Sequence, residues 1–469
     1  MGKITGIYLT PHPPIIIEEI GKDQEGKAQA TVESMETVSL EIQDKKPDTI
    51  VVISPHGPVF SDGIGIRSEA MLKGDFSWFG VPKISMGFHC NQSLIKGIIY
   101  EAQKMDVLAI ELDDIMCSTY DIDSLLDWGV LVPLYFINQQ YSNYKLVTMG
   151  ISQLPFHQLY AFGIAMKKAI ESQDENVIII ASGDLSHRLK EDGPYGYHPA
   201  GEKLDKEIVS LIREGDVEGL LKLDPQLIEE GAECGLRSII MAMGALEGQA
   251  FSSKILSYEG PFGVGYCVAS FDPGQADNSR LLMDNLLRDK DLEIKKLREN
   301  EDAYVRLARQ SIEEYIRHGR VKAIDKELPK AMLEDRAGIF VTIKQHGQLR
   351  GCIGTMEPAR SSIAEEIIHN AISAGTRDPR FLPVEEEELD SLVYSVDVLK
   401  KPEAIQSMDQ LNVKMYGVIV SCGSRNGLLL PNLEGINNPR EQVAIALEKA
   451  GIKEDEPYKM KRFEVIRHQ

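Results

Sequence analysis

The sequence predicts two domains of different class: an α/β front domain with a mainly parallel sheet flanked by helices, and an α+β C-terminal domain. Three observations support this. The chain has 469 residues, more than one hydrophobic core usually organises. Short β-branched segments alternate with amphipathic ones as far as about residue 272, and the apolar pattern then fades over residues 273–300. We therefore expect a front domain over residues 1–272, a linker over 273–300 and a second domain over 301–469.

Four buried strands are predicted in the front domain, because runs rich in β-branched residues end abruptly at Gly, Pro, Asp or His. These runs are Ile4–Leu9, Thr49–Ser54, Tyr144–Met149 and Val177–Ser182. Amphipathic stretches such as Gln158–Ser172 and Asp205–Arg213 lie between or after them. Strands that alternate with helices form a mainly parallel sheet covered on both faces.

The second domain is predicted to begin with a helix. Apolar side chains recur at helical spacing over residues 304–315, and Gly319 supplies a C-terminal cap. The charged run before it, over residues 288–300, is interpreted as a solvated connection that is partly helical. The strands that follow do not alternate strictly with helices, which favours an α+β class. They are Ala337–Ile343, Leu392–Val398 and Val418–Val420.

Composition excludes several classes of partner. A net charge of -21 argues against binding to nucleic acid, which is driven by clustered Lys and Arg. No apolar run approaches the roughly eighteen residues that a bilayer span needs, so no membrane partner is expected. The N-terminal segment meets prolines before a signal-like stretch forms, which predicts a cytoplasmic protein. The six cysteines show no CxxC spacing, so neither a disulfide framework nor a structural zinc site is expected. Homo-oligomer formation stays open.

Three histidines follow predicted strands directly and point to a binding site. His12 lies in TPHPP, His56 in SPHGP and His187 in SGDLSH. The carboxyl ends of parallel strands meet at one edge of a sheet, which is where ligands bind in α/β folds. Imidazole is the commonest ligand of transition metals in proteins. The alternative for each histidine taken alone is an ordinary structural role, and their shared placement favours the site.

A carboxylate would complete a metal site of the non-haem Fe(II) type, in which one face of the ion stays open for substrate and O2. The best candidate is Glu233 in GAECGLR, at the start of the apolar helix expected over Leu236–Leu246. Acidic side chains are also favoured at helix N-termini by the helix dipole. Metal binding and helix capping therefore both remain open for Glu233.

These segments resemble a known family, the LigB-like class III extradiol ring-cleavage dioxygenases, together with the related Memo-like proteins. The segments PHPP, SPHGP, SGDLSH and AECG occur in that family's order over about 270 residues. The resemblance implies that His12, His56 and Glu233 hold Fe(II), with a small catechol-type aromatic and O2 as substrates. It also implies that His187 is the catalytic acid and base. Asp184 is expected either to orient the His187 ring or to cap the following turn.

Two departures from the family pattern affect this interpretation. Trp128 stands in Asp127-Trp128-Gly129, where relatives commonly carry a histidine, and an indole cannot accept a proton. Two alternatives follow: activation of O2 or substrate is impaired, or Trp128 lines a substrate pocket with a flat apolar surface that suits the substrate. Cys234 adjoins Glu233, and Memo-like relatives use a cysteine of a similar segment as a ligand. Cys234 is thus the alternative ligand, and a thiolate would favour Zn²⁺ or copper over iron.

An aromatic loop follows His187 and is a second candidate wall of the substrate pocket. It contains Tyr195, Tyr197 and His198 in the segment GPYGYHP. Clusters of Gly, Pro and Tyr also make ordinary turns, so plain loop packing is the alternative.

The second half of the chain resembles the AMMECR family through LRGCIGT at 349–355, AGTRDPRF at 374–381 and NGLLLP at 426–431. This resemblance implies a fold without an established reaction, and a radical S-adenosylmethionine protein as a partner. Arg350, beside glycine, is a candidate to bind an anion, and Cys352 is a candidate nucleophile because a nearby Arg lowers a thiol pKa. The alternative is that this segment needs small residues for close packing.

The leading prediction is an Fe(II)-dependent extradiol-type dioxygenase fused to an AMMECR domain. The alternative is a metal-binding module without dioxygenase activity, acting within a Memo, AMMECR and radical S-adenosylmethionine system that modifies protein or RNA.

Overall fold

The computed structural model describes all residues except 346–347, 434–435, 437 and 454. The chain divides into two compact units, Met1–Leu287 and Arg288–Gln469. The division falls inside the segment that the sequence marks as a linker. That segment is more regular than expected, because strand β10 runs to Ala276 and the charged stretch forms the long helix α11, Met283–Glu299. Among the helices that the described residues form, none combines the length and the apolar character needed to cross a bilayer.

The first unit is built on an eight-stranded mixed sheet whose central strands are parallel. This confirms the predicted α/β class with a mainly parallel centre. In spatial order the strands are β6 (Ala109–Leu112), β3 (Ile64–Arg67), β7 (Lys145–Gly150), β2 (Thr49–Ser54), β8 (Asn176–Ser182), β1 (Lys3–Thr10), β10 (Tyr266–Ala276) and β9 (Gln249–Glu259). β9 and β10 form an antiparallel edge beside β1.

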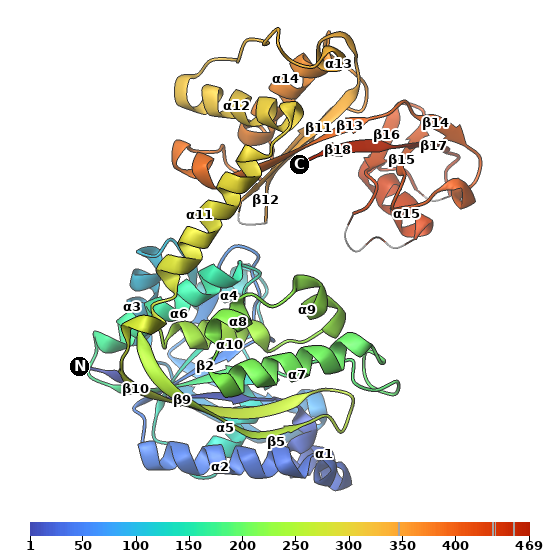
Figure 1. Ribbon diagram of the computed structural model, residues 1–469. Helices are drawn as coiled ribbons and strands as arrows, with labels where there is room; N and C mark the ends of the chain where they lie inside the picture. The colour runs from blue at the N-terminus through green and yellow to red at the C-terminus, as the bar shows by residue number, and fades with distance from the viewer. Residues whose placement is uncertain (346–347, 434–435, 437, 454) are drawn as a thin grey trace. The chain divides into compact units, whose positions relative to one another are not determined.

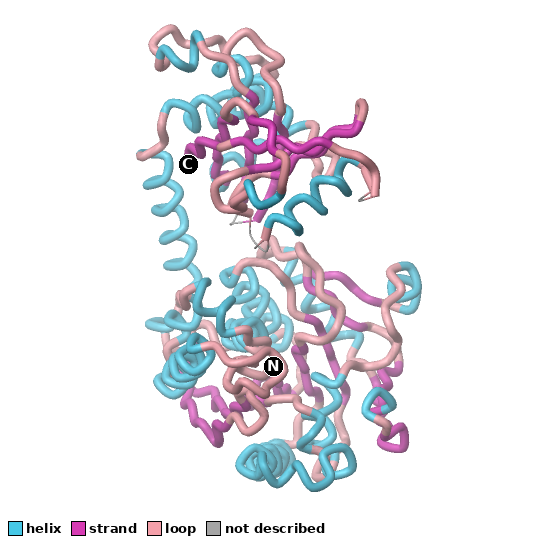
Figure 2. The backbone as a smooth tube through the Cα atoms, turned by 90° about the vertical axis from the view of Figure 1, so that its right-hand side faces the viewer, coloured by secondary structure: helices cyan, strands magenta, loops and turns pink. Residues whose placement is uncertain are grey.

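Helices cover both faces of this sheet, and each face has its own hydrophobic core (Figures 1 and 2). One core contains alternate strand residues such as Ile7, Val51 and Ile179, and the other contains Ile50 and Ile178. The first face carries α3 (Gln92–Gln103), α6 (Phe156–Glu171), α7 (Pro199–Glu214) and α10 (Leu236–Gly244), and the second carries α2 (Gln29–Lys45), α5 (Trp128–Asn138) and the hairpin of β4 (Met71–Phe76) and β5 (Val81–His89). Shorter helices are α1 (Glu18–Gly21), α4 (Asp114–Thr119), α8 (Val217–Leu221) and α9 (Pro225–Gly231).

The second unit contains two antiparallel sheets and is α+β, as predicted. The first sheet has the order β12 (Gln348–Gly354), β11 (Gly338–Gln345), β13 (Leu392–Leu399) and β18 (Val465–His468). The second has the order β14 (Glu403–Ile405), β17 (Lys459–Phe463), β15 (Gly417–Cys422) and β16 (Arg425–Leu429). The helices are α12 (Ala303–His318), α13 (Lys330–Glu334), α14 (Ile363–Thr376) and α15 (Pro439–Ala450).

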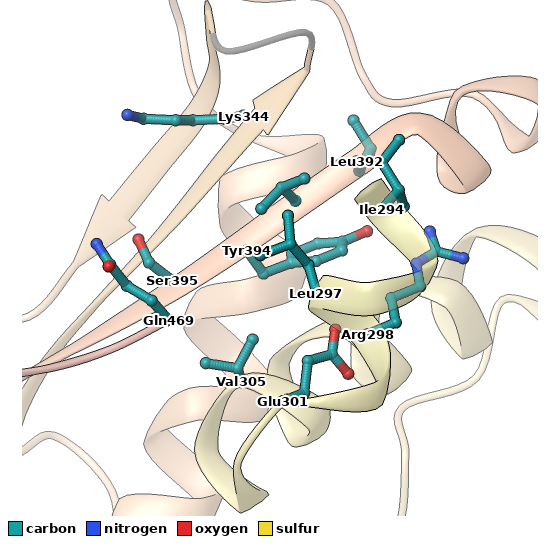
Figure 3. Close-up of a pocket in the computed structure, with 11 residues that line it drawn as sticks. Ile294, Leu297, Arg298, Glu301, Val305, Lys344, Leu392, Tyr394, Ser395 and Gln469 are labelled. Atoms are coloured by element: carbon teal, nitrogen blue, oxygen red, sulfur yellow. The ribbon is translucent and has the colours of Figure 1, made fainter. Parts of the chain in front are cut away.

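Helices α12 and α14 cover only one face of the first of these sheets. Gly319 ends α12 in the left-handed conformation, as its position in the sequence predicts. The C-terminal half of α11 also belongs to this unit. Its residues Ile294 and Leu297 lie opposite Leu392 and Tyr394 across a small apolar pocket of about 240 Å³ (Figure 3). The segment interpreted as a solvated connection thus contributes packing surface to the second unit.

Candidate metal centre

Three loops that follow neighbouring parallel strands form one edge of the front sheet. β1 ends at Thr10, β2 at Ser54 and β8 at Ser182, and these strands lie in the order β2, β8, β1. Thr10 pairs with Ser182, so the strands end at the same level. The loop after β1 carries His12 and the loop after β2 carries His56. The rule that places ligand sites at the carboxyl ends of parallel strands therefore brings two predicted histidines together.

His12, His56 and Cys234 form a cluster of three potential ligands. The Nε2 atoms of His12 and His56 are 2.9 Å apart, and Cys234 Sγ is 3.8 Å from His12 Nε2. All three ligand atoms lie within 4.8 Å of one another. Two imidazole nitrogens bound at about 2.1 Å to one ion, at a right angle, are about 3.0 Å apart. The spacing of the two histidines therefore fits a shared divalent cation.

The surroundings of His12 select the tautomer that a metal needs. His12 is 2% exposed, and its Nδ1 lies 3.0 Å from Ser182 Oγ. Ser182 donates its only hydroxyl proton to the Gly129 carbonyl, at 2.5 Å. Because that proton is committed, Ser182 Oγ accepts from Nδ1–H of His12. Nε2 of His12 is then unprotonated, and its lone pair faces His56 and Cys234.

Burial keeps both imidazoles neutral. It lowers the pKa of His12 to about 3, with a smaller contribution from the charge of His187. Burial also lowers the pKa of His56 to about 3, with contributions from His12 and His187. Neutral imidazoles are the form that binds metal. At neutral pH the two rings therefore present nitrogen lone pairs.

Cys234 reaches the cluster because the turn before α10 packs tightly against the loop after β8. The backbone N–H groups of Cys234 and Gly235 both donate to the Asp184 carbonyl, at 3.2 and 2.9 Å. A Cβ atom on Gly183 would lie 2.1 Å from the Cα of Gly235, so this contact requires a glycine. Asp184 N–H in turn donates to Cys234 Sγ at 3.3 Å. Burial raises the pKa of the thiol, so a bound cation is the partner that would stabilise its thiolate.

The carboxylate of Glu233 has a different set of contacts from the one expected of a ligand. Its Oε2 accepts from the backbone N–H of Leu236, the first residue of α10, at 2.5 Å. Burial raises the pKa of Glu233 to about 7, while this hydrogen bond and the charge of Arg237 act against the rise. Of the two roles that the sequence leaves open, helix capping matches these contacts. Cys234, the alternative ligand, is the one that the structure groups with the histidines.

Asp184 and His187 lie beside the cluster but do not pair in the way expected. Asp184 Oδ1 accepts from the backbone N–H of His12 at 3.0 Å, and its Oδ2 is 3.8 Å from His12 Nε2. Asp184 thus fixes the loop of His12. His187 is oriented by a carbonyl, because its Nδ1 lies 2.7 Å from the oxygen of Ala232. A carbonyl only accepts, so Nδ1 carries the proton and Nε2 of the neutral ring is free to take one.

An aromatic pocket of about 330 Å³ adjoins the cluster, lined by His56, Trp128 and Phe79 among others. The Trp128 ring lies 4.2 Å from the His56 ring at an interplanar angle of 30°, and Phe79 meets Trp128 edge-on. Trp128 is the first residue of α5, whose N-terminus is capped by Asp127. Sequence reasoning missed the contribution of the hairpin β4–β5, which supplies Trp78 and Phe79 through the turn segment FSWFG. The three aromatic residues in this five-residue segment were the available signal.

The aromatic loop after His187 has other contacts. Tyr195 is 65% exposed and meets the His187 ring edge-on, with 5.5 Å between the ring centroids. Tyr197 is 41% exposed. His198 Nδ1 accepts from the backbone N–H of Ala200 and so caps α7. Among the described residues that line the 330 Å³ pocket, none comes from this loop. Tyr195 therefore contacts His187 and does not line this pocket.

Of the candidate residues in the second unit, Arg350 holds a loop in place and Cys352 lines a cleft. Arg350 donates two hydrogen bonds to Glu388, at 2.7 and 2.9 Å, and further ones to the carbonyls of Leu382 and Pro383. Its guanidinium is thus engaged in holding a loop. Cys352 is half-buried and lines a cleft. A Cβ atom on Gly351 would lie 2.2 Å from the Ala374 carbonyl, so close packing explains this glycine.

Comparison with known proteins follows the same division of the chain. Residues 6–269 match the family model described as the catalytic LigB subunit of aromatic ring-opening dioxygenase, and residues 305–468 match AMMECR1. A protein of Clostridium acetobutylicum is 44% identical over 467 residues, which is 99% of each chain. A protein of Thermotoga maritima is 48% identical over 170 residues, covering 36% of this chain and 98% of that one.

The crystal structure of an uncharacterized protein from Pyrococcus horikoshii is 36% identical, covers 35% of this chain and 88% of that chain, and has a TM-score of 0.33. Family models together match most of the chain, and the Clostridium relative shares both parts. The chain therefore belongs to the family of the catalytic LigB subunit of aromatic ring-opening dioxygenases, with an AMMECR1 domain fused behind it.

Proposed function

We propose that the first unit is a metal-dependent extradiol-type oxidoreductase that opens the ring of a catechol-type aromatic with O2. His12, His56 and Cys234 are its metal ligands. Fe(II) is the metal that this reaction class requires, whereas the thiolate in the ligand set favours a softer ion, which the second candidate function below takes up. The observation that carries the proposal is the cluster of these three side chains beside a pocket walled by Trp128 and Phe79. A family relationship to ring-opening dioxygenases supports the same reaction class.

The residues around the cluster have separate roles in substrate binding, proton transfer and positioning of the metal ligands. Trp128 and Phe79 offer flat apolar surfaces on which an aromatic ring stacks. A bound Fe(II) would supply open positions at which a catecholate and O2 are gathered. His187 takes the proton from the substrate hydroxyl at Nε2, because Nδ1 is held by the Ala232 carbonyl. Ser182 and Asp184 keep His12 in place and in the right tautomer.

The test is anaerobic loading with Fe(II), followed by O2 uptake with a panel of catechols. We expect stoichiometric iron and uptake with at least one catechol. His187→Ala is the matched variant, and it should retain the iron while turnover falls by about 10²-fold or more. Iron bound at one equivalent without O2 uptake on any catechol would refute the dioxygenase proposal and leave the metal centre standing.

A second candidate function is favoured by two features of the same centre. A thiolate in the ligand set favours softer ions such as Zn²⁺ or copper. Trp128, which cannot accept a proton, stands where the resemblance to the dioxygenase family implies a histidine. On this second proposal the unit is a metal-binding module that acts with a radical S-adenosylmethionine protein. Metal analysis of the protein purified without added metal distinguishes the two. Zinc or copper at one equivalent, together with inactivity toward phenols after iron loading, supports the module.

A further inference from the structure

The second unit contains a cleft of about 460 Å³ between its two sheets, remote in sequence from the metal ligands. A cavity of this size is typical of sites for small organic molecules. One wall is the open face of the sheet that contains β11 and β13, and the other carries residues of β16, of the segment after it and of α15. The lining residues from this second wall are Leu428, Leu429, Leu430, Leu433 and Lys449.

The sheet wall consists of the alternate residues of each strand that point away from the core. In β11, Val341 and Ile343 are buried beneath α12 and α14, whereas Thr342 and Lys344 line the cleft. Thr342 pairs with Cys352 on one side and with Ser395 on the other. Figure 3, drawn around a neighbouring pocket, shows Lys344 and Ser395 on the sheet beside Tyr394. The face that helices leave uncovered therefore presents polar side chains to the cleft, together with the apolar side chains of Phe340 and Leu349. It is the floor of the cleft.

Cationic groups line both walls of this cleft, in a protein that is strongly acidic overall. Lys344, Arg380, Lys449 and Arg467 line the cleft, and Asp397 is its only acidic lining residue among those described. Arg467 is paired with Asp397 at 2.8 and 2.9 Å, and Arg380 is paired with Asp378. Among the described residues, Lys344 and Lys449 form no ion pair. Two positive charges are thus left over here, although the whole chain carries a net charge of -21.

Cys352 lies on the same floor. Its Sγ accepts from Thr342 Oγ1 at 3.3 Å, and its backbone N–H donates to Asp378 at 2.8 Å. Arg380, which is paired with Asp378, also donates to the Cys352 carbonyl at 3.3 Å. The cysteine is half-buried, so a molecule in the cleft would cover its thiol.

We propose that this cleft binds a small amphiphilic anion, with its carboxylate or phosphate group at Lys344 and Lys449, its apolar body against the leucines, and the Cys352 thiol beneath it. Lysine ammonium groups bind such oxyanions as point charges. Leucine side chains beside these two charges select for a molecule with one anionic and one apolar end. The proposal concerns the second unit alone and does not depend on the proposed function of the metal centre.

The test measures the rate at which iodoacetamide alkylates Cys352 in the full chain, read by mass spectrometry. The probes are hexanoate and hexyl phosphate, which share an apolar body and differ in the anion. Inorganic phosphate and hexanol serve as probes that carry only one of the two features. Cys422, half-buried in the same unit but outside the cleft lining, is the internal reference. A probe at ten times its dissociation constant should slow alkylation of Cys352 about tenfold and leave Cys422 unchanged.

Variants of the two exposed lysines assign the anion site. Lys344→Gln and Lys449→Gln should each weaken protection roughly tenfold, because each removes a charge-assisted contact. Lys414→Gln, at an exposed lysine outside the cleft lining, is the matched control and should behave like the parent. The better protection by hexanoate or by hexyl phosphate identifies the anion as carboxylate or phosphate. The proposal is overturned if neither probe slows Cys352, if Cys422 is slowed equally, or if hexanol protects as well as the anions.

Discussion

Replacing Ser182 with Ala tests whether a serine that touches no metal sets the affinity of the centre. Ser182 is fully buried and joins His12 Nδ1 to the Gly129 carbonyl through hydrogen bonds of 3.0 and 2.5 Å. The substitution leaves a buried N–H and a buried C=O without this partner, which costs about 1–3 kcal/mol of unfolding free energy. The imidazole also loses the acceptor that selects its tautomer. Loss of such an orienting partner lowers metal affinity about 10- to 100-fold.

Two measurements separate these effects. Urea unfolding of the metal-free protein gives the stability cost, and titration against a chelator of known affinity gives the metal dissociation constant. Ser39→Ala is the matched control, because Ser39 is also buried and donates to a backbone carbonyl, that of Phe136, at 2.8 Å. Ser39→Ala should lose stability and keep its metal affinity. If Ser182→Ala binds metal as tightly as Ser39→Ala does, the tautomer argument is wrong.

Four other predictions follow from the same contacts. Cys234→Ser should weaken metal binding strongly. Glu233→Gln should keep the metal and lose about 1 kcal/mol of stability, because the capping interaction of α10 is weakened. If a metal titration shows weaker binding by Glu233→Gln than by Cys234→Ser, Glu233 is the ligand. His12→Ala should abolish stoichiometric metal, and metal retained at one equivalent would contradict the ligand assignment. Trp78→Phe leaves Trp128 as the single tryptophan, and its ring lies 4.2 Å from the ring of His56. Loading this variant with a paramagnetic ion should therefore quench its fluorescence. Unchanged emission at full loading would place the ion elsewhere. Burial raises the pKa of Asp205 from 3.8 to about 6, so between these values the folded state holds more protons than the unfolded state, and the contribution of Asp205 to stability falls as pH rises from about 4 to 6. In urea unfolding, the stability of Asp205→Asn should therefore rise relative to that of the parent over this pH range. A stability difference that does not change with pH would refute this prediction.

The sequence was sufficient for the parts of the site that follow from strand order. β2 coincides with the predicted Thr49–Ser54, and parallel strands bring their following loops to one edge, so the meeting of His12 and His56 could be expected. The sequence could not show which of the two adjacent residues, Glu233 or Cys234, faces the two histidines. Ala232 adopts a left-handed conformation with φ of 51°, and the next residues are held by the Asp184 carbonyl. Side-chain direction there depends on a contact between residues 184 and 234, which no local pattern reveals.

The same reasoning explains what was missed around the site. Asp184 lies three residues before His187, and sequence proximity suggested a shared role. The chain instead turns so that Asp184 meets the loop of His12, 172 residues away. The hairpin β4–β5 was not predicted. β4 is short, although it alternates between exposed and buried positions, and β5 is mostly exposed and has no regular buried face. These features depend on tertiary contacts.

The backbone contact between Gly183 and Gly235 sets the distance between the Cys234 thiol and the His12 imidazole. Two chain segments meet there with no side chain between them, and any added carbon acts as a spacer. Gly235→Ala would push the cysteine-bearing turn outward without altering a single donor atom. The position of the Cys234 thiol relative to the two histidines is therefore set by the absence of a methyl group behind it.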